Sequence, residues 1–239
     1  MFLHGLAGTA EVWRPLLSAL EERWEGEWLL VDLAGHGRSP WRGSYSIGAH
    51  AADVADAVGR RRSVIVVGHS MGGAVGLALA SGWFGLEVDL VVAAGVKVEW
   101  SAGEVKRARD LAERPPREFL THREAASFWL RLAGLDGLWE ADAPTVAPAV
   151  VERRGNFTLT FDNRANEVAG SPIRSLLSAV QGRVVLVRGS RDPLVSDAQL
   201  RELGHTPLVV GGAGHNVHVE APRTFADVLL AQISLKEQA

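Results

Sequence analysis

The sequence predicts an α/β fold built on a mostly parallel, doubly wound sheet of about six strands. Short runs rich in β-branched residues alternate along the chain with amphipathic helical segments, and glycines separate them. The run Val64–Val67 is apolar at every position, which is typical of a strand covered by helices on both faces. Strands that alternate with helices favour parallel pairing through right-handed crossovers.

Six segments have the length and composition of strands, and the segments between them have helical periodicity. The expected strands are Met1–His4, Trp28–Leu33, Ser63–Gly68, Val88–Ala94, Arg183–Val187 and Pro207–Val210. The expected helices are Glu11–Arg23, Ile47–Arg60 and the small-residue run Gly73–Ser81.

The segment 96–170 breaks this alternation. It has no clean strand pattern, and it contains Arg-rich helical pieces, aromatic residues and several prolines. Because it shows neither an internal repeat nor a low-complexity linker, we expect a helical insertion that covers the C-terminal edge of the sheet as a lid. The α/β core then consists of residues 1–95 and 171–239.

Composition argues against several classes of function. Hydrophobic residues make up 47% of the chain, and 25 Lys and Arg face 28 Asp and Glu, with the basic residues scattered. A nucleic-acid partner is therefore not expected. The chain has no cysteine, which excludes disulfides, a thiolate nucleophile and a Cys-type zinc site. No run approaches the roughly 18 apolar residues of a membrane span, and no signal peptide is evident, so we expect a cytoplasmic enzyme with no membrane partner.

The segment Gly68–Gly72, with the sequence Gly-His-Ser-Met-Gly, has the pattern of a nucleophile elbow. In such an elbow a serine sits on a sharp strand-to-helix turn, and glycines remove Cβ clashes there. The turn would present the Ser70 hydroxyl at a helix N-terminus, where the helix dipole stabilises developing negative charge. A glycine-rich packing turn is the alternative, which the preceding strand and following helix disfavour.

A serine nucleophile needs a base and a group that orients the base, because its hydroxyl is unreactive at neutral pH. Asp192 follows the expected strand Arg183–Val187, and His215 follows Pro207–Val210. Both would lie at carboxyl ends of strands, where the active sites of open α/β sheets gather. The order Ser, Asp, His is the one expected with this elbow. Taken singly, Asp192 could begin an Asx turn and His215 could be a solvated loop histidine.

Two backbone N–H groups are candidates for an oxyanion hole. Met71, directly after the serine, offers one, and Leu6 in the glycine-containing turn His4–Gly8 offers the other. A plain glycine turn is the alternative for the second. His218 lies one helical turn after His215, but no carboxylate stands at metal-ligand spacing, so we expect no metal site.

These motifs resemble the α/β-hydrolase superfamily, and the resemblance covers nearly the whole chain. The matching segments, in family order, are 4–8 (HGLAG), 32–39 (DLAGHGRS), 68–72 (GHSMG), Asp192 and 214–215 (GH). The resemblance implies Ser70 as nucleophile, Asp192 as orienting acid and His215 as general base. It also implies an oxyanion hole from Leu6 and Met71, and no cofactor.

The expected reaction is hydrolysis of carboxylic esters of small to medium hydrophobic substrates. A helical lid with aromatic residues over a catalytic serine would form an apolar pocket for such substrates. The residues expected to contact substrate are His4, His69, Phe128 and Trp129. Dehalogenase and epoxide hydrolase chemistry is disfavoured, since their elbow nucleophile is an aspartate. A catalytically poor ligand receptor is a further alternative, since a fold does not determine function.

The segment Ala213–Pro222 and the early motifs are also similar to the menaquinone-pathway SHCHC synthase subfamily, a lyase that eliminates pyruvate. This resemblance implies a cofactor-free lyase with the same triad as the alternative function. The subfamily has an arginine four residues after the nucleophile that holds a substrate carboxylate, and this chain has Ala74 there. The arginines that could replace it are Arg107, Arg109, Arg114 and Arg123.

The family usually has an antiparallel strand pair before the strand that ends in His-Gly, and this sequence begins at that strand. We therefore expect Trp28–Leu33 to be an exposed, apolar edge strand, which invites pairing with another chain. The expectation is a homodimer through this edge or a start codon upstream of Met1.

Overall fold

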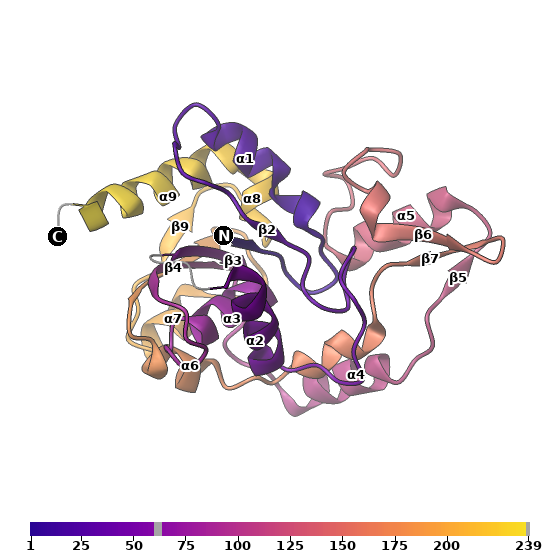
Figure 1. Cartoon of the computed structure of the whole chain (residues 1–239), viewed down its shortest axis with the longest axis horizontal. Helices are drawn as coiled ribbons and strands as arrows, with labels where there is room; N and C mark the ends of the chain where they lie inside the picture. Colours follow the sequence, from indigo (N-terminus) through magenta and orange to yellow (C-terminus); the bar gives the residue numbers. More distant parts are fainter. Residues whose placement is uncertain (60–63, 238–239) are drawn as a thin grey trace.

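A six-stranded parallel sheet forms the centre of the computed structural model, which describes residues 1–59 and 64–237 (Figure 1). The strand order is β2-β1-β3-β4-β8-β9, and every neighbouring pair is parallel. The strands are β1 (Phe2–Leu3), β2 (Leu30–Val31), β3 (Val64–His69), β4 (Val88–Ala94), β8 (Arg183–Gly189) and β9 (Leu208–Val210). The predicted fold class and its six parallel strands are confirmed.

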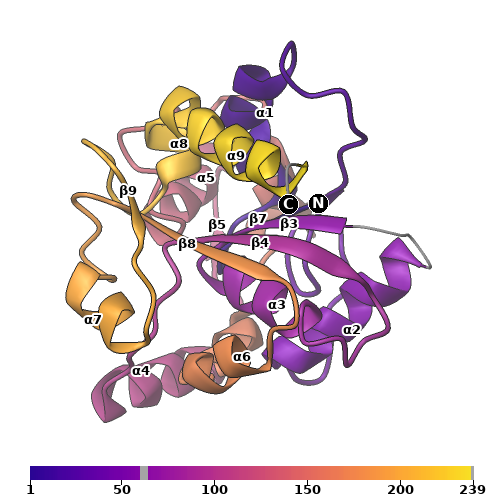
Figure 2. The same cartoon turned by 90° about the vertical axis from the view of Figure 1, so that its left-hand side faces the viewer.

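Helices pack on both faces of this sheet. Figure 2 shows α1, α8 and α9 on one face and α2, α3 and α6 on the other. Their bounds are α1 (Arg14–Leu20), α2 (Ile47–Val58), α3 (Met71–Leu79), α6 (Ile173–Ala179), α8 (Val217–Glu220) and α9 (Pro222–Glu237). A further helix, α7 (Asp197–Glu202), precedes β9. In the ranges 1–59 and 64–237 no helix combines the length and apolar character that crossing a bilayer requires.

Local signals explain where several of these elements begin and end. The Ser46 hydroxyl accepts a hydrogen bond from the Ala49 N–H at 3.1 Å and so caps α2, which ends at Val58 because Gly59 follows with a φ of 64°. The expected helix Glu11–Arg23 is instead a 3₁₀ turn, η1 (Ala10–Trp13), followed by the shorter α1. The expected ends at Arg60 and Ser63 lie outside the described residues.

The edge strand β2 is much shorter than the expected Trp28–Leu33. After Val31 the chain leaves the sheet. The Asp32 carboxylate holds it there by accepting hydrogen bonds from the Ala10 and Arg38 N–H groups at 2.7 and 3.1 Å. The next N–H, that of Leu33, donates to His4 Nε2 instead of to a strand. The edge exists as expected, but its predicted length was wrong.

The segment between β4 and α6, which we call the insertion, is not entirely helical. It contains α4 (Ala102–Ala112), β5 (Glu118–Phe119), α5 (His122–Leu132), η2 (Ala147–Ala149), β6 (Val150–Arg153), β7 (Asn156–Leu159) and η3 (Asn163–Val168). Its strands form a separate antiparallel sheet in the order β5-β7-β6, which lies with α5 at one end of the molecule (Figure 1). Arg154 and Gly155 both have positive φ and close a two-residue hairpin. The insertion therefore contains helices, as expected, together with a small antiparallel sheet that the sequence did not predict, and its role as a lid stays a prediction.

Candidate active site

Ser70 lies on a strained turn between β3 and α3. Its backbone has a φ of 49° and a ψ of −113°, a conformation that residues with a side chain rarely adopt. The Ser70 N–H donates a 2.8 Å hydrogen bond to the carbonyl of Ala94 at the end of β4. This bond holds the turn at the carboxyl edge of the sheet, where α3 begins at the next residue.

Glycine is required on both sides of Ser70 because backbones approach closely there. A Cβ at Gly72 would lie 2.1 Å from the carbonyl oxygen of Leu3, and a Cβ at Gly68 would lie 2.4 Å from the carbonyl oxygen of Gly72. Since the neighbouring atoms belong to backbone, a side chain could fit only if strand and helix separated. The two glycines therefore let α3 begin against β1 and expose Ser70 between them.

Asp192 and His215 form a hydrogen-bonded pair. The Nδ1–H of His215 donates to Asp192 Oδ2 at 3.0 Å, and Asp192 Oδ1 accepts from the Leu194 N–H at 2.9 Å. The Asp192 side chain is fully buried. Burial alone would raise the pKa of this carboxyl, but the interactions with His215, the hydrogen bond from the Leu194 N–H and the charge of Arg188 together hold the pKa below its ordinary value. Asp192 is therefore an anion that orients the imidazole of His215.

The loop that carries His215 is anchored from two sides. The Glu220 carboxylate accepts hydrogen bonds from the N–H groups of Gly214 and Asn216, at 2.7 and 3.0 Å, on either side of His215. On the opposite side, His69 Nε2–H donates to the His215 carbonyl at 3.0 Å. Sequence reasoning missed Glu220, although it lies in the same segment as His215. Its carboxylate sets the position of His215 through the backbone.

Ser70 and His215 face the same cavity, but they are not hydrogen-bonded to each other. In the described part of the chain the Ser70 hydroxyl has no hydrogen-bond partner, while His215 keeps its bond to Asp192. Catalytic hydrogen bonds are often long in enzymes without bound substrate and tighten when the substrate binds. The structure thus joins two of the three predicted triad residues and places the third on the same cavity wall.

The candidate oxyanion donors lie beside Ser70. Leu6 and Met71 both line the cavity, and neither N–H donates to another group within the described ranges. The loop His4–Gly8 passes so close that a Cβ at Gly5 would lie 3.3 Å from Ser70 Cβ. The two N–H groups are free to bind an oxygen at this wall.

Three of the four residues expected to contact substrate lie elsewhere. His4 is buried, its Nδ1–H donates to the Gly5 carbonyl, and its Nε2 accepts from the Leu33 N–H. It therefore holds the loop His4–Gly8 in place without lining the cavity. Trp129 is buried and donates from its indole to the Ala7 carbonyl. Phe128 lines a different hollow. None of these three side chains lines the cavity around Ser70, while His69 does.

The cavity has a volume of about 510 Å³ and a mostly apolar wall that includes residues of the insertion. The wall residues that sequence reasoning did not assign include Leu132, Phe161, Val168, Ile173 and Leu194. Phe161 follows β7, a strand that the sequence did not predict, so its position could not be inferred.

Charged residues are few at this cavity. Ala74 lines the cavity, but none of the candidate replacement arginines does, namely Arg107, Arg109, Arg114 and Arg123. Of the described residues, Arg131 and Lys97 are the Lys and Arg side chains on the wall, and Lys97 pairs with Glu104. Within the described ranges no group of three or more His, Cys, Asp or Glu side chains could hold a metal ion.

Comparison with known proteins shows similarity along the whole chain. A model of the alpha/beta hydrolase family matches residues 1–228. The chain is 31% identical to a 2-succinyl-6-hydroxy-2,4-cyclohexadiene-1-carboxylate synthase of Salmonella heidelberg, over 98% of this chain and 92% of that protein. It is 27% identical to esterase Rv0045c of Mycobacterium tuberculosis, over 96% and 80% respectively. Its fold is similar to the thioesterase domain from the curacin biosynthetic pathway, with a TM-score of 0.76, 21% identity and coverage of 96% and 89%.

Proposed function

The chain belongs to the α/β-hydrolase family, and we propose that it is a serine hydrolase that cleaves carboxylic esters of small to medium hydrophobic substrates. The observation that carries the proposal is the Asp192–His215 hydrogen bond, which orients an imidazole on the same cavity wall as the strained Ser70. Similarity to an esterase supports the same chemistry.

In the proposed reaction, Nε2 of His215 takes the proton of the Ser70 hydroxyl as its oxygen attacks the ester carbonyl carbon. The buried Asp192 carboxylate stabilises the imidazolium that forms. The tetrahedral intermediate collapses, the C–O bond to the alcohol breaks, and the imidazolium gives its proton to the departing alkoxide. Water then attacks the acyl-enzyme by the same route, which releases the acid and restores Ser70.

The Leu6 and Met71 N–H groups would bind the negatively charged oxygen of both tetrahedral intermediates. Each such donor in a serine hydrolase contributes about 10²- to 10³-fold to kcat. Met71 is also the first residue of α3, so the helix dipole adds to the stabilisation. The backbone of the elbow and of the His4–Gly8 loop therefore supplies much of the proposed catalytic effect.

The cavity supports a hydrophobic substrate of limited size. Its volume of about 510 Å³ lies within the roughly 300–1,000 Å³ range of small-molecule sites. Leu132, Phe161 and Val168 from the insertion form part of its wall. We therefore retain residues 96–170 as a lid in this proposal, with the acyl chain held between the lid and α3.

Hydrolysis of p-nitrophenyl esters from acetate to decanoate tests the proposal. We expect the highest kcat/KM at short to medium chain lengths and a loss of about 10⁴-fold or more in kcat for Ser70→Ala. A Ser70→Ala enzyme that hydrolyses the butyrate ester at the original rate would overturn the proposal.

A second candidate function is a lyase reaction of the SHCHC synthase type, favoured by the 31% identity to such a synthase over 98% of the chain. Ala74 weighs against it, because the subfamily has a carboxylate-binding arginine at that position. A coupled assay for pyruvate discriminates the two, since ester hydrolysis releases an alcohol and an acid but no pyruvate.

Two further expectations remain predictions. We place the enzyme in the cytoplasm, and we expect a homodimer through the β2 edge, although that edge provides only two ladder residues. A stable monomer on a sizing column would contradict the predicted homodimer.

A further inference from the structure

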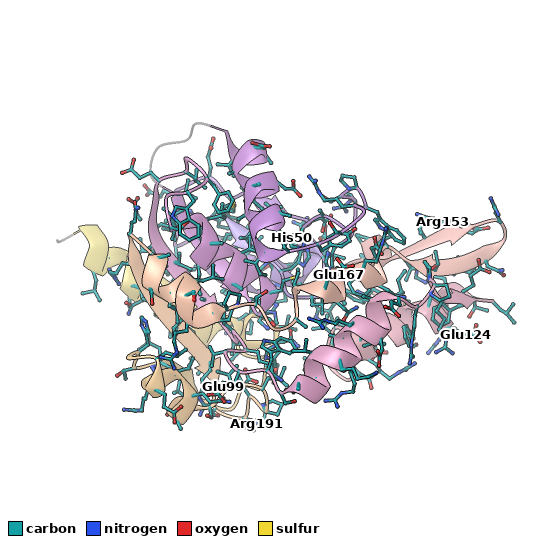
Figure 3. The ribbon with its side chains drawn as sticks, turned by 90° about the horizontal axis from the view of Figure 1, so that it is seen from below. His50, Glu99, Glu124, Arg153, Glu167 and Arg191 are labelled. Atoms are coloured by element: carbon teal, nitrogen blue, oxygen red, sulfur yellow. The ribbon has the colours of Figure 1, made fainter. Side chains whose placement is uncertain are left out.

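A second hollow of about 570 Å³ lies on the insertion, and neither Ser70, Asp192 nor His215 lines it. Its walls come from the β5 region and from α5, at the end of the molecule where Figure 3 labels Glu124. We call it the arginine groove, after its residues Arg117, Arg123 and Arg131.

The three arginines face the groove from two elements. Arg123, Ser127 and Arg131 follow one another at intervals of four along α5 and so share one side of the helix. Arg117 lies just before β5, with its guanidinium 5.0 and 5.1 Å from the rings of Phe128 and Phe119. All three arginines are exposed, and none forms an ion pair with any residue in 1–59 or 64–237.

Two carboxylates also line the groove, but neither is paired with an arginine among the residues that the structure describes. Glu124 accepts from the Thr121 N–H at 3.1 Å and completes the cap of α5. Glu118 accepts from the side-chain amide of Asn156 at 2.9 Å. The groove therefore has three positive and two negative charges, and its guanidinium donors remain available to an external anion.

The arginine groove adjoins the catalytic cavity, because Arg131 lines both. A substrate could therefore place its apolar part near Ser70 and an anionic part in the groove. Arg123 and Arg131 are eight residues apart, about 12 Å along the helix axis, so the anionic part must be extended or have more than one charge. Phosphate fits this arrangement, because guanidinium groups bind it bidentately and it has a charge of about −1.5 to −2.

We propose that the arginine groove binds a phosphate-bearing leaving group, so that the preferred substrates are acyl esters or thioesters of a phosphorylated alcohol or thiol. The inference rests on the proposed hydrolase function and specifies its substrate class. The acyl chain occupies the apolar cavity, the scissile carbonyl lies at Ser70, and the phosphate reaches the arginines. After acyl transfer, the phosphorylated alcohol or thiol leaves through the groove.

The test compares matched substrates with and without phosphate. Butyryl-coenzyme A is compared with butyryl-pantetheine, and 1-butyryl-glycerol 3-phosphate with 1-butyryl-glycerol. We expect kcat/KM to be at least about 10-fold higher for the phosphorylated member of one pair, mainly through KM, and the difference to shrink at high salt. The pair that shows the preference identifies a thiol carrier or a glycerol phosphate as the source.

Arg123→Gln is the variant for this test, because Arg123 lines the groove but not the catalytic cavity. It should lose most of the preference for phosphate and keep its activity on the unphosphorylated member. Arg109→Gln is the matched control, since Arg109 is also an exposed helical arginine and lines neither hollow. Equal kcat/KM within both pairs for the wild type, or an unchanged preference in Arg123→Gln, would overturn the inference.

A binding measurement separates this inference from the proposed function. Coenzyme A and glycerol 3-phosphate are titrated calorimetrically against the wild type and Arg123→Gln. One outcome is that one of these ligands binds the wild type, binds Arg123→Gln about 10-fold more weakly, and yet no ester is hydrolysed. This outcome would overturn the proposed function and support phosphate binding by the arginine groove. If esters are hydrolysed but neither ligand binds, phosphate binding by the arginine groove is contradicted and the proposed function is supported.

Discussion

The indole N–H of Trp129 donates a 2.7 Å hydrogen bond to the carbonyl of Ala7, which lies 122 residues earlier in the chain. Trp129 is buried in α5, and Ala7 has a φ of 61°, a strained value for a residue with a side chain. Ala7 directly follows Leu6, one of the two candidate oxyanion donors. The insertion therefore holds the loop that would bind the oxyanion.

Replacing Trp129 by Phe removes this hydrogen bond and keeps most of the ring volume. We expect kcat on p-nitrophenyl butyrate to fall about 10-fold with a smaller change in KM. The reason is that displacing the Leu6 N–H would weaken its hydrogen bond to the transition state more than its contact with bound substrate. The melting temperature should fall by only a few degrees, as is typical when a buried carbonyl loses its donor.

Trp139→Phe is the matched control for this prediction. Trp139 packs against Trp129 with ring centroids 6.4 Å apart, and the change leaves the bond to Ala7 intact. Equal effects of the two variants on kcat would show that the indole N–H of Trp129 does not position the loop.

The Asp192–His215 bond makes a second prediction. Asp192→Asn keeps the size of the side chain but removes the charge that stabilises the imidazolium and selects the tautomer. We expect kcat to fall about 10⁴-fold while far-UV circular dichroism stays unchanged. A loss smaller than about 10-fold, measured on folded protein, would remove Asp192 from the proposed mechanism.

The close approach of α3 and β1 predicts that Gly72→Ala is strongly destabilising. The new Cβ would lie 2.1 Å from the Leu3 carbonyl oxygen, so the helix or the strand must move. We expect a loss of about 3 kcal/mol or more in the free energy of unfolding, measured by urea denaturation. Gly43→Ala is the control, because a Cβ there meets no atom within 4 Å. Similar denaturation midpoints for the two variants would contradict the packing at the elbow.

Buried histidines should make the protein less stable in mild acid. Burial lowers the pKa of His50 to about 4 and that of His218 to about 3, and neither ring has a hydrogen-bond partner within the described ranges. Between about pH 6.5 and 5 the unfolded chain takes up protons at these positions and the folded protein does not, so stability falls as pH falls. Each such histidine contributes about 1.4 kcal/mol per pH unit to this slope.

Urea denaturation at pH values from 7.5 to 5 measures this slope. His218→Gln should make it shallower, since the substituted side chain does not titrate. The His205→Gln variant is the control, because His205, unlike His50 and His218, is not buried. An unfolding free energy that is constant from pH 7 to 5 would contradict the buried, neutral state of these rings.

The parallel sheet and the elbow were predictable because their signals are local. The strand Val88–Ala94 has the predicted bounds, and the Gly-His-Ser-Met-Gly segment directly encodes a turn that only glycine neighbours permit. Asp192 and His215 could be inferred as partners because both follow parallel strands, whose carboxyl ends meet at one edge of a sheet.

The insertion and the substrate-contacting residues were not predictable in this way. Strands β6 and β7 have four residues each. In the sequence a strand this short resembles a loop, and its pairing with the partner strand is seen only in the folded structure. Which side of α5 faces the cavity depends on how the helix is rotated against its neighbours. That rotation buries Trp129 under the Ala7 loop and leaves Arg131 at the cavity wall. No local pattern in the sequence encodes it.

Covalent labelling with a fluorophosphonate, followed by peptide mass spectrometry, tests the central claim most directly. The proposed mechanism predicts one label per chain, located on Ser70, and labelling that is at least 100-fold slower in His215→Ala. Labelling at a different serine, or ester hydrolysis that persists after complete labelling of Ser70, would contradict it.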